Sequence, residues 1–347
     1  MELLKKLTET PGVSGREEKI RDLIRNEMKP LVDSVEVDTL GNVVGLKKGG
    51  GSAPGKAMVI AHMDEIGFLV TYIDDDGFIR ITPVGGFDPR TLVAQRVTVH
   101  GEKDLPGTLM PAVKPIHLMK EEEKKKGFDV PDFFIDVGLP GEEVKKLVSV
   151  GDPVTLSRSL LQVGQTISGK AFDDRLGVYV MLEALRRMGD HQFDICAVAS
   201  VEEERGLIGA ITAGYRIEPD VCIALDLTIA LDTPGSDKKD RVTSLGEGTA
   251  IKIMDSGSIS NPALVRFLKE LAEKEGIKHQ MEILPRGATD AAAVKRSRGG
   301  VPVGTISIPG RYVHSNVETV HKADVEASID LLSRFLERAH EADYRLA

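Results

Sequence analysis

Short apolar runs that alternate with amphipathic helical patterns are the feature that most limits the fold of this chain. Apolar residues recur at helical spacing in several segments, for example from Asp174 to Met188. The runs between such segments have the length of buried strands and occupy Met58–Ala61, Ile195–Val201, Val221–Leu225 and Val303–Ile308. This alternation favours a mixed or largely parallel sheet with helices on both faces. The predicted fold class is therefore α/β.

Two helix starts can be located from their capping residues. Ser14-Gly-Arg-Glu17 has the pattern of a capping box, in which the serine and glutamate side chains bind the first backbone N–H groups of a helix. Asn261-Pro262 combines a favoured N-cap residue with proline at the first helical position. Apolar residues follow both motifs at helical spacing. We therefore expect a helix after Glu17 and another after Asn261.

The segment from about Thr71 to Leu161 has a different pattern. Tyr72–Ile79 is typical of a hairpin around an Asp-Gly turn, and one short stretch, Glu142–Leu147, fits a helix. Other stretches are typical of short strands, at Arg96–His100, Phe133–Val137 and Pro153–Leu156. We expect a small β-rich, barrel-like domain at residues 70–162, inserted into an α/β domain formed by residues 1–69 and 163–347.

The composition excludes several classes of protein. Among 347 residues, 54 acidic and 45 basic side chains leave a formal charge of −9, which argues against a nucleic-acid-binding protein. No uncharged apolar run approaches the roughly 20 residues that span a bilayer, so no membrane segment is expected. Cys196 and Cys222 lie in apolar runs and are interpreted as buried thiols of a cytoplasmic protein. The chain has no tryptophan, so sugar stacking has little support.

Each apolar run leads into potential metal ligands. The carboxyl ends of parallel strands line one crevice of an open α/β sheet, so side chains that follow these runs are expected to meet there. The acidic pair Asp173-Asp174, which opens a predicted helix, is expected to join them. The side chains that follow the runs are His62 and Asp64, then Glu202, Glu203 and Glu204, then Asp226, and finally His314.

The residue types in this group favour a two-metal site. A cluster of carboxylates without cations repels itself, and two divalent cations would neutralise it. Mixed imidazole and carboxylate ligands suit Zn²⁺ or a related transition metal. His62 and Asp64 point to the same face of an extended chain, so Asp64 can orient the His62 ring. The run Glu202–Glu204 offers one acid more than ligation requires, which could act as the base for a water shared by the two metals.

Each motif taken alone has an ordinary explanation. A His-x-Asp triplet is usually structural or solvated, and consecutive acids after a strand usually begin a charged helix. The repetition of such residues after four separate runs, together with Asp173, is what favours a metal site.

Five segments that contain these residues resemble the TET (tetrahedral) aminopeptidases, metallopeptidase family forty-two. The resemblance extends from about residue 10 to residue 330, in the same order along the chain. The segments are Ala61-His-Met-Asp-Glu-Ile-Gly67, Ala171-Phe-Asp-Asp-Arg175, Glu203-Glu-Arg-Gly-Leu-Ile-Gly-Ala210, Ala224-Leu-Asp226 and Arg311-Tyr-Val-His314.

The resemblance implies a role for each matching residue. His62 and Asp226 would bind one metal, Glu204 and His314 the other, and Asp173 would bridge the two. Glu203 would be the general base, and Asp64 would support His62. The implied cofactors are two Zn²⁺ or Co²⁺ ions per subunit. The implied substrates are short peptides, cleaved at the N-terminal peptide bond. The implied assembly is a homododecamer built from dimers through the inserted domain.

Some alternatives remain open. A metal-dependent amidohydrolase or deacylase on the same fold would share every ligand, and a glycoside hydrolase resembling an endoglucanase would use only a carboxylate pair. Arg205 and Asn316 depart from the family pattern. The segment Gly287–Asp290 resembles the family's glycine-rich stretch and is interpreted as a pocket wall. The sequence leaves the preferred N-terminal residue, the native metal and the roles of Glu65, Arg205 and Arg286 open.

Overall fold

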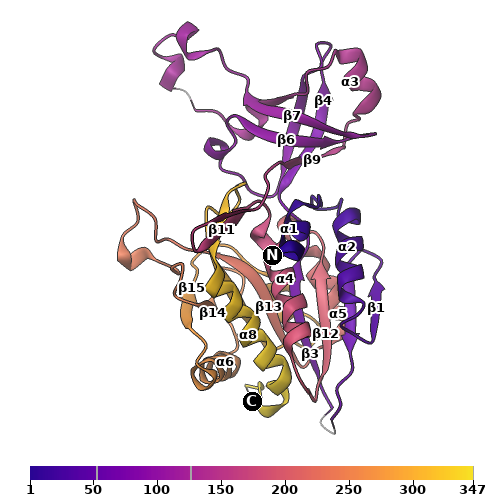
Figure 1. Ribbon diagram of the computed structural model, residues 1–347, viewed down its shortest axis with the longest axis vertical. Helices are drawn as coiled ribbons and strands as arrows, with labels where there is room; N and C mark the ends of the chain where they lie inside the picture. The colour runs from indigo at the N-terminus through magenta and orange to yellow at the C-terminus, as the bar shows by residue number, and fades with distance from the viewer. Residues whose placement is uncertain (52–53, 126, 347) are drawn as a thin grey trace. The chain divides into compact units, whose positions relative to one another are not determined.

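The computed structural model describes residues 1–51, 54–125 and 127–346, and it separates into two compact units (Figure 1). The first unit comprises Met1–Glu65, Ser159–Val313 and Val317–Ala347, and the second comprises Ile66–Arg158 with His314–Asn316. Among the described residues, none of the helices combines the length and the apolar character needed to cross a membrane.

The first unit is built on one mixed sheet. Its centre is formed by four strands in the order β12, β3, β13, β16, and each neighbouring pair is parallel. These strands contain the four apolar runs except for Val201, which follows β12, so the predicted parallel arrangement is confirmed. Their bounds are Lys56–His62 for β3, Asp194–Ser200 for β12, Val221–Ile229 for β13 and Val303–Arg311 for β16.

Shorter strands extend the sheet on both sides. On one side β2 and then β1 pair antiparallel, and on the other β17, β11 and β10 follow β16, while β14 and β15 branch from β16. The bounds are Ser34–Val37 (β1), Val43–Lys47 (β2), Leu161–Val163 (β10), Thr166–Gly169 (β11), Thr249–Met254 (β14), His279–Ile283 (β15) and Glu318–His321 (β17).

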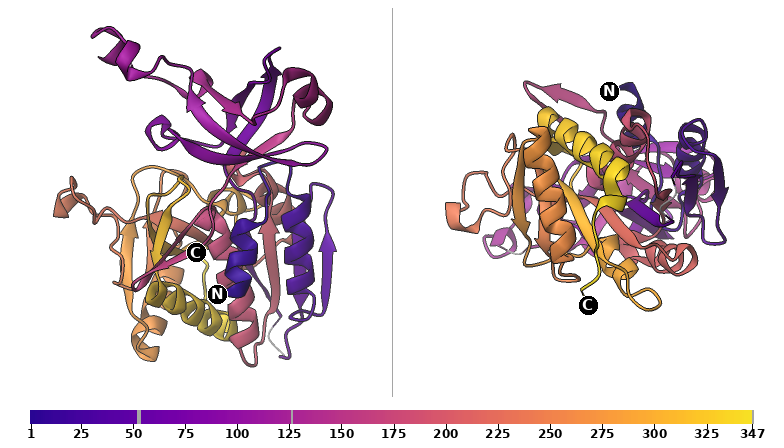
Figure 2. Two further views of the ribbon diagram at one scale, coloured as in Figure 1. Left: turned by 45° about the horizontal axis from the view of Figure 1, so that its top comes forward. Right: turned by 90° about the horizontal axis from the view of Figure 1, so that it is seen from below.

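Helices cover both faces of this sheet (Figures 1 and 2). Alternate residues of β3 show the two faces, because Val59 packs in one apolar core and Met58 and Ile60 pack in another. The first core is covered by α1 (Glu2–Glu9), α2 (Glu18–Met28), α4 (Phe172–Arg187), α6 (Pro262–Glu275) and α8 (Lys322–Arg338). The second is covered by α5 (Ile208–Ile217) and α7 (Asp290–Lys295), and short 3-10 turns lie at Glu203–Arg205 (η5), Lys238–Asp240 (η6) and Ala339–Glu341 (η7). The predicted α/β class is confirmed.

One of the two predicted caps is confirmed and the other is wrong. Asn261 caps α6, because its side chain accepts hydrogen bonds from the N–H groups of Ala263 and Leu264 at 2.9 and 3.0 Å. Helix α2 begins at Glu18 without a side-chain cap, and Ser14 lies in a turn before it. The turn forms because Gly15 takes a φ of 76°, which glycine adopts readily. The Ser14–Glu17 motif therefore does not form a capping box.

The second unit is a closed antiparallel barrel with its own apolar core. The predicted hairpin is confirmed, because Ile73 pairs with Ile79 across the turn. The strands follow the order β4 (Gly67–Ile73), β5 (Ile79–Val84), β8 (Phe133–Asp136), β7 (Asp104–Pro111), β6 (Gln95–His100) and β9 (Pro153–Leu156). A helix, α3, spans Gly141–Leu147, and 3-10 turns lie at Pro89–Thr91, Ile116–Leu118, Glu123–Lys125 and Val130–Asp132.

Candidate metal centre

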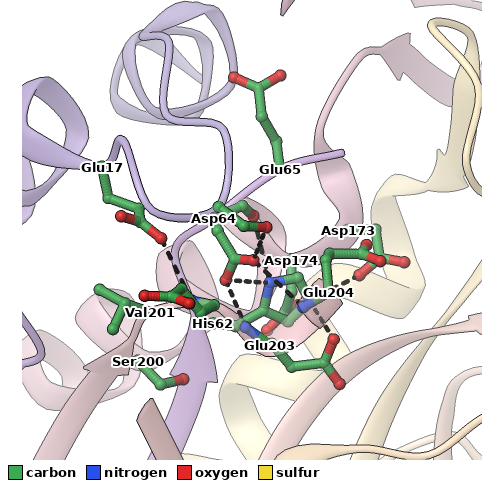
Figure 3. A network of polar contacts seen from close by, with 12 residues as sticks. Glu17, His62, Asp64, Glu65, Asp173, Asp174, Ser200, Val201, Glu203 and Glu204 are labelled. Carbon is green, nitrogen blue, oxygen red and sulfur yellow. Dashed lines mark hydrogen bonds and ion pairs between the residues drawn. The ribbon is translucent and has the colours of Figure 1, made fainter. Parts of the chain in front are cut away.

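The His62 ring lies at the carboxyl end of β3 with its two nitrogens in different surroundings (Figure 3). Nδ1 lies 3.2 Å from the backbone oxygen of Asp64 and 3.4 Å from its carboxylate Oδ1. Nε2 points the other way and lies 3.0 Å from Oδ1 of Asp173. Because Asp64 offers only acceptors to Nδ1, Nε2 is the nitrogen available to a metal ion.

His62 is shared by two groups of side chains that could each hold a metal ion. In the first group its ligand atom and those of Asp173 and Glu204 lie within 4.8 Å of one another. In the second group, within the same limit, it is joined by Asp174 and Asp226. Both groups combine an imidazole with carboxylates, which is a donor set that divalent transition metals favour. Asp174 is buried and its Oδ2 has no hydrogen-bond partner, as expected for an atom that would face a cation.

The side chain of Glu318 holds the turn that carries Asp173 and Asp174. Glu318 accepts hydrogen bonds from the backbone N–H groups of Phe172 at 2.6 Å and Asp173 at 3.2 Å. The peptide bond between Asp173 and Asp174 is cis, and Ala171 before it has a φ of 54°. Asp173 belongs to the first candidate ligand group and Asp174 to the second.

Glu65, whose role the sequence leaves open, anchors the same turn through buried ion pairs. Its carboxylate pairs with the Lys170 ammonium and lies 3.5 Å from Nη2 of Arg175. It also accepts a hydrogen bond from the Gly12 N–H at 3.2 Å. Arg175 in turn donates to the backbone oxygen of Leu7 at 2.6 Å. Glu65 therefore links the end of β3 to the start of α4.

The loop after β12 carries Glu203 and Glu204. The backbone N–H groups of these residues donate to Oδ1 and Oδ2 of Asp64 at 3.0 and 3.2 Å, and that of Glu202 donates to Glu17 at 3.2 Å. Glu203 belongs to neither ligand group, although its Oε2 lies 4.0 Å from Nε2 of His62. It is therefore a carboxylate beside the two candidate groups that neither group includes.

The electrostatics of the site favour bound cations. Burial, together with repulsion from neighbouring acids, raises the pKa of Asp174, Asp226 and Glu203 well above the usual range. Burial opposes the charge on His62, but hydrogen bonds to Asp173 and Asp64 outweigh it and raise the His62 pKa well above its ordinary value. The raised pKa values favour protonation of this cluster, and divalent cations would supply the positive charge instead.

Two further buried residues, missed by sequence reasoning, border the site. Asp290 accepts a hydrogen bond from the Ser200 hydroxyl, while its Oδ1 has no partner. Burial raises the pKa of Asp290 to about 6. The sequence marks the Gly287–Asp290 segment only as a pocket wall. No pattern indicated that the charge of Asp290 interacts with those of His62 and Glu203.

The remaining predicted ligand, His314, lies in the second unit. It follows β16 with a φ of 62°, and the next residue but one, Asn316, donates to Oε1 of Gln95 at 2.6 Å. The structure therefore brings together His62, Asp173, Glu204 and Asp226, and the metal-binding role of His314 remains a proposal. Arg205 is exposed, and the described residues include no ion-pair partner for it.

The family of M42 glutamyl aminopeptidases matches residues 41–331 of the chain. The chain is also similar to a lysyl aminopeptidase of Pyrococcus furiosus, with 40% identity over 349 residues that cover 99% of this chain and 98% of the relative. Glutamyl and lysyl aminopeptidases are thus both among the proteins similar to this chain.

Solved structures agree with this match. An aminopeptidase from the archaeon Desulfurococcus kamchatkensis has a TM-score of 0.93 and 44% identity, covering 97% of this chain and 94% of its own. The TET1 peptidase of Pyrococcus horikoshii, described as assembling into a tetrahedron or a large octahedral shell, has a TM-score of 0.85 and 33% identity, covering 96% and 98%. The chain therefore belongs to the M42 aminopeptidase family and is a peptidase with the TET fold.

Proposed function

We propose that this peptidase removes single residues from the N-terminus of short peptides at a pair of divalent metal ions. The observation that carries the proposal is that His62 takes part in two groups of potential ligands while Glu203 lies beside both and belongs to neither. A two-metal hydrolase needs this combination of shared ligands and an uncommitted base.

The proposed ligands follow the roles that the resemblance implies. His62 and Asp226 would hold one ion, Glu204 and His314 the other, and Asp173 would bridge them. Support comes from the 3.0 Å approach of Asp173 to His62 and from the mixed donor set, which suits Zn²⁺ or Co²⁺. Asp174 would complete the surroundings of the ion at Asp226, because its free Oδ2 is buried in the same group.

Residues of the chain would transfer the protons that peptide-bond hydrolysis requires. The bound cations would polarise the scissile carbonyl and lower the pKa of the attacking water. Glu203 would take a proton from that water and pass it to the amine that leaves, and burial, which raises the Glu203 pKa, strengthens it as a base. Asp64 would keep Nδ1 of His62 protonated, so that Nε2 faces the metal. The nearby carboxylates would attract the substrate's free ammonium group, which accounts for cleavage at the N-terminus.

The proposal is tested with a panel of aminoacyl chromogenic substrates, assayed before chelation, after chelation and after restoration of Zn²⁺ or Co²⁺. We expect turnover that chelation removes and metal restores. Glu203→Gln should lower kcat by about 10²–10⁴-fold, the usual contribution of a general base, with unchanged metal content. Glu202→Gln, at the neighbouring position, is the matched control. Wild-type turnover in Glu203→Gln would show that another group is the base.

Two other activities can be separated in the same assay. An amidohydrolase or deacylase would cleave N-acyl substrates in preference to those with a free amine. A glycoside hydrolase that uses a carboxylate pair would survive chelation. Family membership and the imidazole among the ligands both support the aminopeptidase.

We further propose that the protein works in the cytoplasm as a homo-oligomer, a dodecamer built from dimers through the second unit. The shell described for the Pyrococcus horikoshii relative supports assembly, and exposed apolar side chains in the second unit, at Val113, Ile116 and Leu118, offer contact surface. The two cysteines are free and buried, as in proteins of reducing compartments. Sedimentation of wild type and of Ile116→Lys/Leu118→Lys tests the assembly, and the double variant should sediment as a smaller species. A wild-type monomer would refute it.

A further inference from the structure

Two carboxylates from distant parts of the chain hold three consecutive backbone N–H groups of the loop after β12. The N–H of Glu202 donates to Oε1 of Glu17 at 3.2 Å. The N–H groups of Glu203 and Glu204 donate to the two carboxylate oxygens of Asp64 at 3.0 and 3.2 Å. Each N–H of this stretch is thereby bound by a side chain from another segment. Figure 3 shows Asp64 beside Glu203 and Glu204.

The Ser14–Glu17 segment places two side chains where they contact Asp64 and the backbone of Glu202. The Ser14 hydroxyl donates to Oδ2 of Asp64 at 2.6 Å, and the Gly15 N–H donates to Oε1 of Glu17 at 2.7 Å. The turn is closed by a hydrogen bond from the Arg16 N–H to the Val13 oxygen at 2.7 Å. Ser14 and Glu17 are buried, with 7% and 5% of their surface exposed, although the helix that follows them lies at the surface of the unit. These two side chains serve the loop instead of capping helix α2.

The loop needs such support because it cannot cap itself. Glu203–Arg205 is a single 3-10 turn, and the first N–H groups of any helical turn lack partners within it. Glu202, which precedes the turn, has a φ of 52° and makes no side-chain cap. Without outside acceptors, the backbone that aims Glu203 and Glu204 would be free to move.

We propose that Glu17, assisted by Ser14, is a positioning residue that fixes the loop carrying the general base Glu203 and the metal ligand Glu204. This inference rests on the roles proposed above for those two glutamates. Glu17 belongs to neither candidate ligand group and acts on the loop through the backbone of Glu202. Ser14 acts through Asp64, which holds the next two N–H groups.

The geometry predicts which substitutions the position tolerates. Both N–H groups that Glu17 binds, those of Gly15 and Glu202, donate to the same oxygen, Oε1. A glutamine places an amide oxygen at this point and can accept both bonds, whereas alanine can accept neither. Glu17→Gln should therefore hold the loop as wild type does, and Glu17→Ala should not. Glu18→Ala is the matched control, because Glu18 is the same residue type at the exposed start of the same helix.

Amide hydrogen exchange of the metal-free protein tests the contact directly. In Glu17→Ala we expect the amide of Glu202 and its neighbours to exchange about tenfold faster, which is the effect of losing one hydrogen bond of ordinary strength. Glu17→Gln and Glu18→Ala should exchange as wild type does. Equal protection of residues 202–204 in Glu17→Ala and wild type would overturn the inference. Because this measurement involves no turnover, it stands even if the proposed activity is wrong.

Kinetics of the metal-loaded enzyme test the consequence. Glu17→Ala should lower kcat about 10- to 100-fold, the usual effect of removing a residue that orients ligands, with much less change in KM. Glu17→Gln should restore kcat. An equal loss in both variants would show that the charge of Glu17 matters and not its shared acceptor, which would overturn the inference. If Glu17→Ala does not fold, Ser14→Ala decides the question. Faster exchange at Glu203 and Glu204 supports the inference, and unchanged exchange refutes it.

Discussion

Nε2 of His62 lies 3.0 Å from Oδ1 of Asp173, and this contact holds the imidazole in its protonated form when no metal is bound. Burial and repulsion between acids raise the pKa values of Asp226 and Glu203, which favours further protons in the same cluster. Metal ligands must be deprotonated before they bind a cation. We therefore expect Zn²⁺ binding to the metal-free protein to release protons near pH 7, and the affinity to rise with pH.

Calorimetric titration in buffers of different ionisation enthalpy measures the released protons. His62→Asn should release fewer protons and bind metal more weakly, because it removes a proposed ligand of the ion at Asp226 together with the raised pKa of the imidazole. Identical binding enthalpies in all buffers would contradict the proposed protonation of the cluster.

Removal of the Glu65 charge should destabilise the fold strongly. Glu65→Gln leaves Lys170 and Arg175 buried without their anionic partner. Breaking a buried ion pair by removing one partner costs about 3–5 kcal/mol. Urea unfolding of the metal-free protein measures the change. Asp75→Asn is the control, because Asp75 forms its 2.6 Å ion pair with Lys145 at the surface and its loss should leave the midpoint unchanged. A midpoint for Glu65→Gln equal to that of wild type would contradict the buried network.

Glu17 should make stability depend on pH. Burial, followed by repulsion from Asp64, raises its pKa from 4.5 to about 7 in the folded protein. The folded state therefore binds the proton more tightly, so the stabilisation is complete below pH 4.5 and is lost as the pH rises through about 7. Glu17→Gln removes this ionisation. The difference in unfolding free energy between variant and wild type should grow across this window by about 3 kcal/mol at most. A constant difference would contradict the raised pKa.

The two functions of Asn261 can be separated by substitution. Asn261→Ala removes the N-cap of α6 and should cost about 1 kcal/mol or somewhat more, because the side chain also donates to the backbone oxygen of Tyr344 at 2.7 Å. Asn261→Asp keeps the cap acceptor and loses only that donor. Thermal unfolding should rank wild type first, the aspartate variant second and the alanine variant third. Equal losses in both variants would show that the cap contributes little.

The strands and helices that could be predicted are those marked by patterns within a short stretch of sequence. The apolar runs gave the parallel strands, because a strand buried on both faces must be almost wholly apolar, as in Met58–Ala61. Strand β7 was missed, since it contains Asp104, Pro106 and Gly107, residues that a sheet accepts only where a neighbouring strand and a closed barrel constrain them.

The site could be predicted less completely, for a similar reason. Residues that follow the apolar runs were found, because strand order brings their ends together. Asp174 was named beside Asp173 but received no ligand role, since a sequence does not show where each of two adjacent acids points. Ser14 and Glu17 were assigned to their own helix, because a Ser-x-x-Glu pattern cannot show that its partners are a carboxylate and an N–H group from other parts of the chain.

The strand order also sets the sequence of events as the chain is synthesised. Strand β3 ends at His62, but its neighbours β12 and β13 begin only at Asp194 and Val221. At ordinary rates of translation, β12 is synthesised on the order of ten seconds after β3. All strands of the barrel are synthesised during that interval. Pairings so distant in the chain close slowly. The barrel strands can therefore pair before the metal-ligand groups assemble, although the histidine common to both groups is made first.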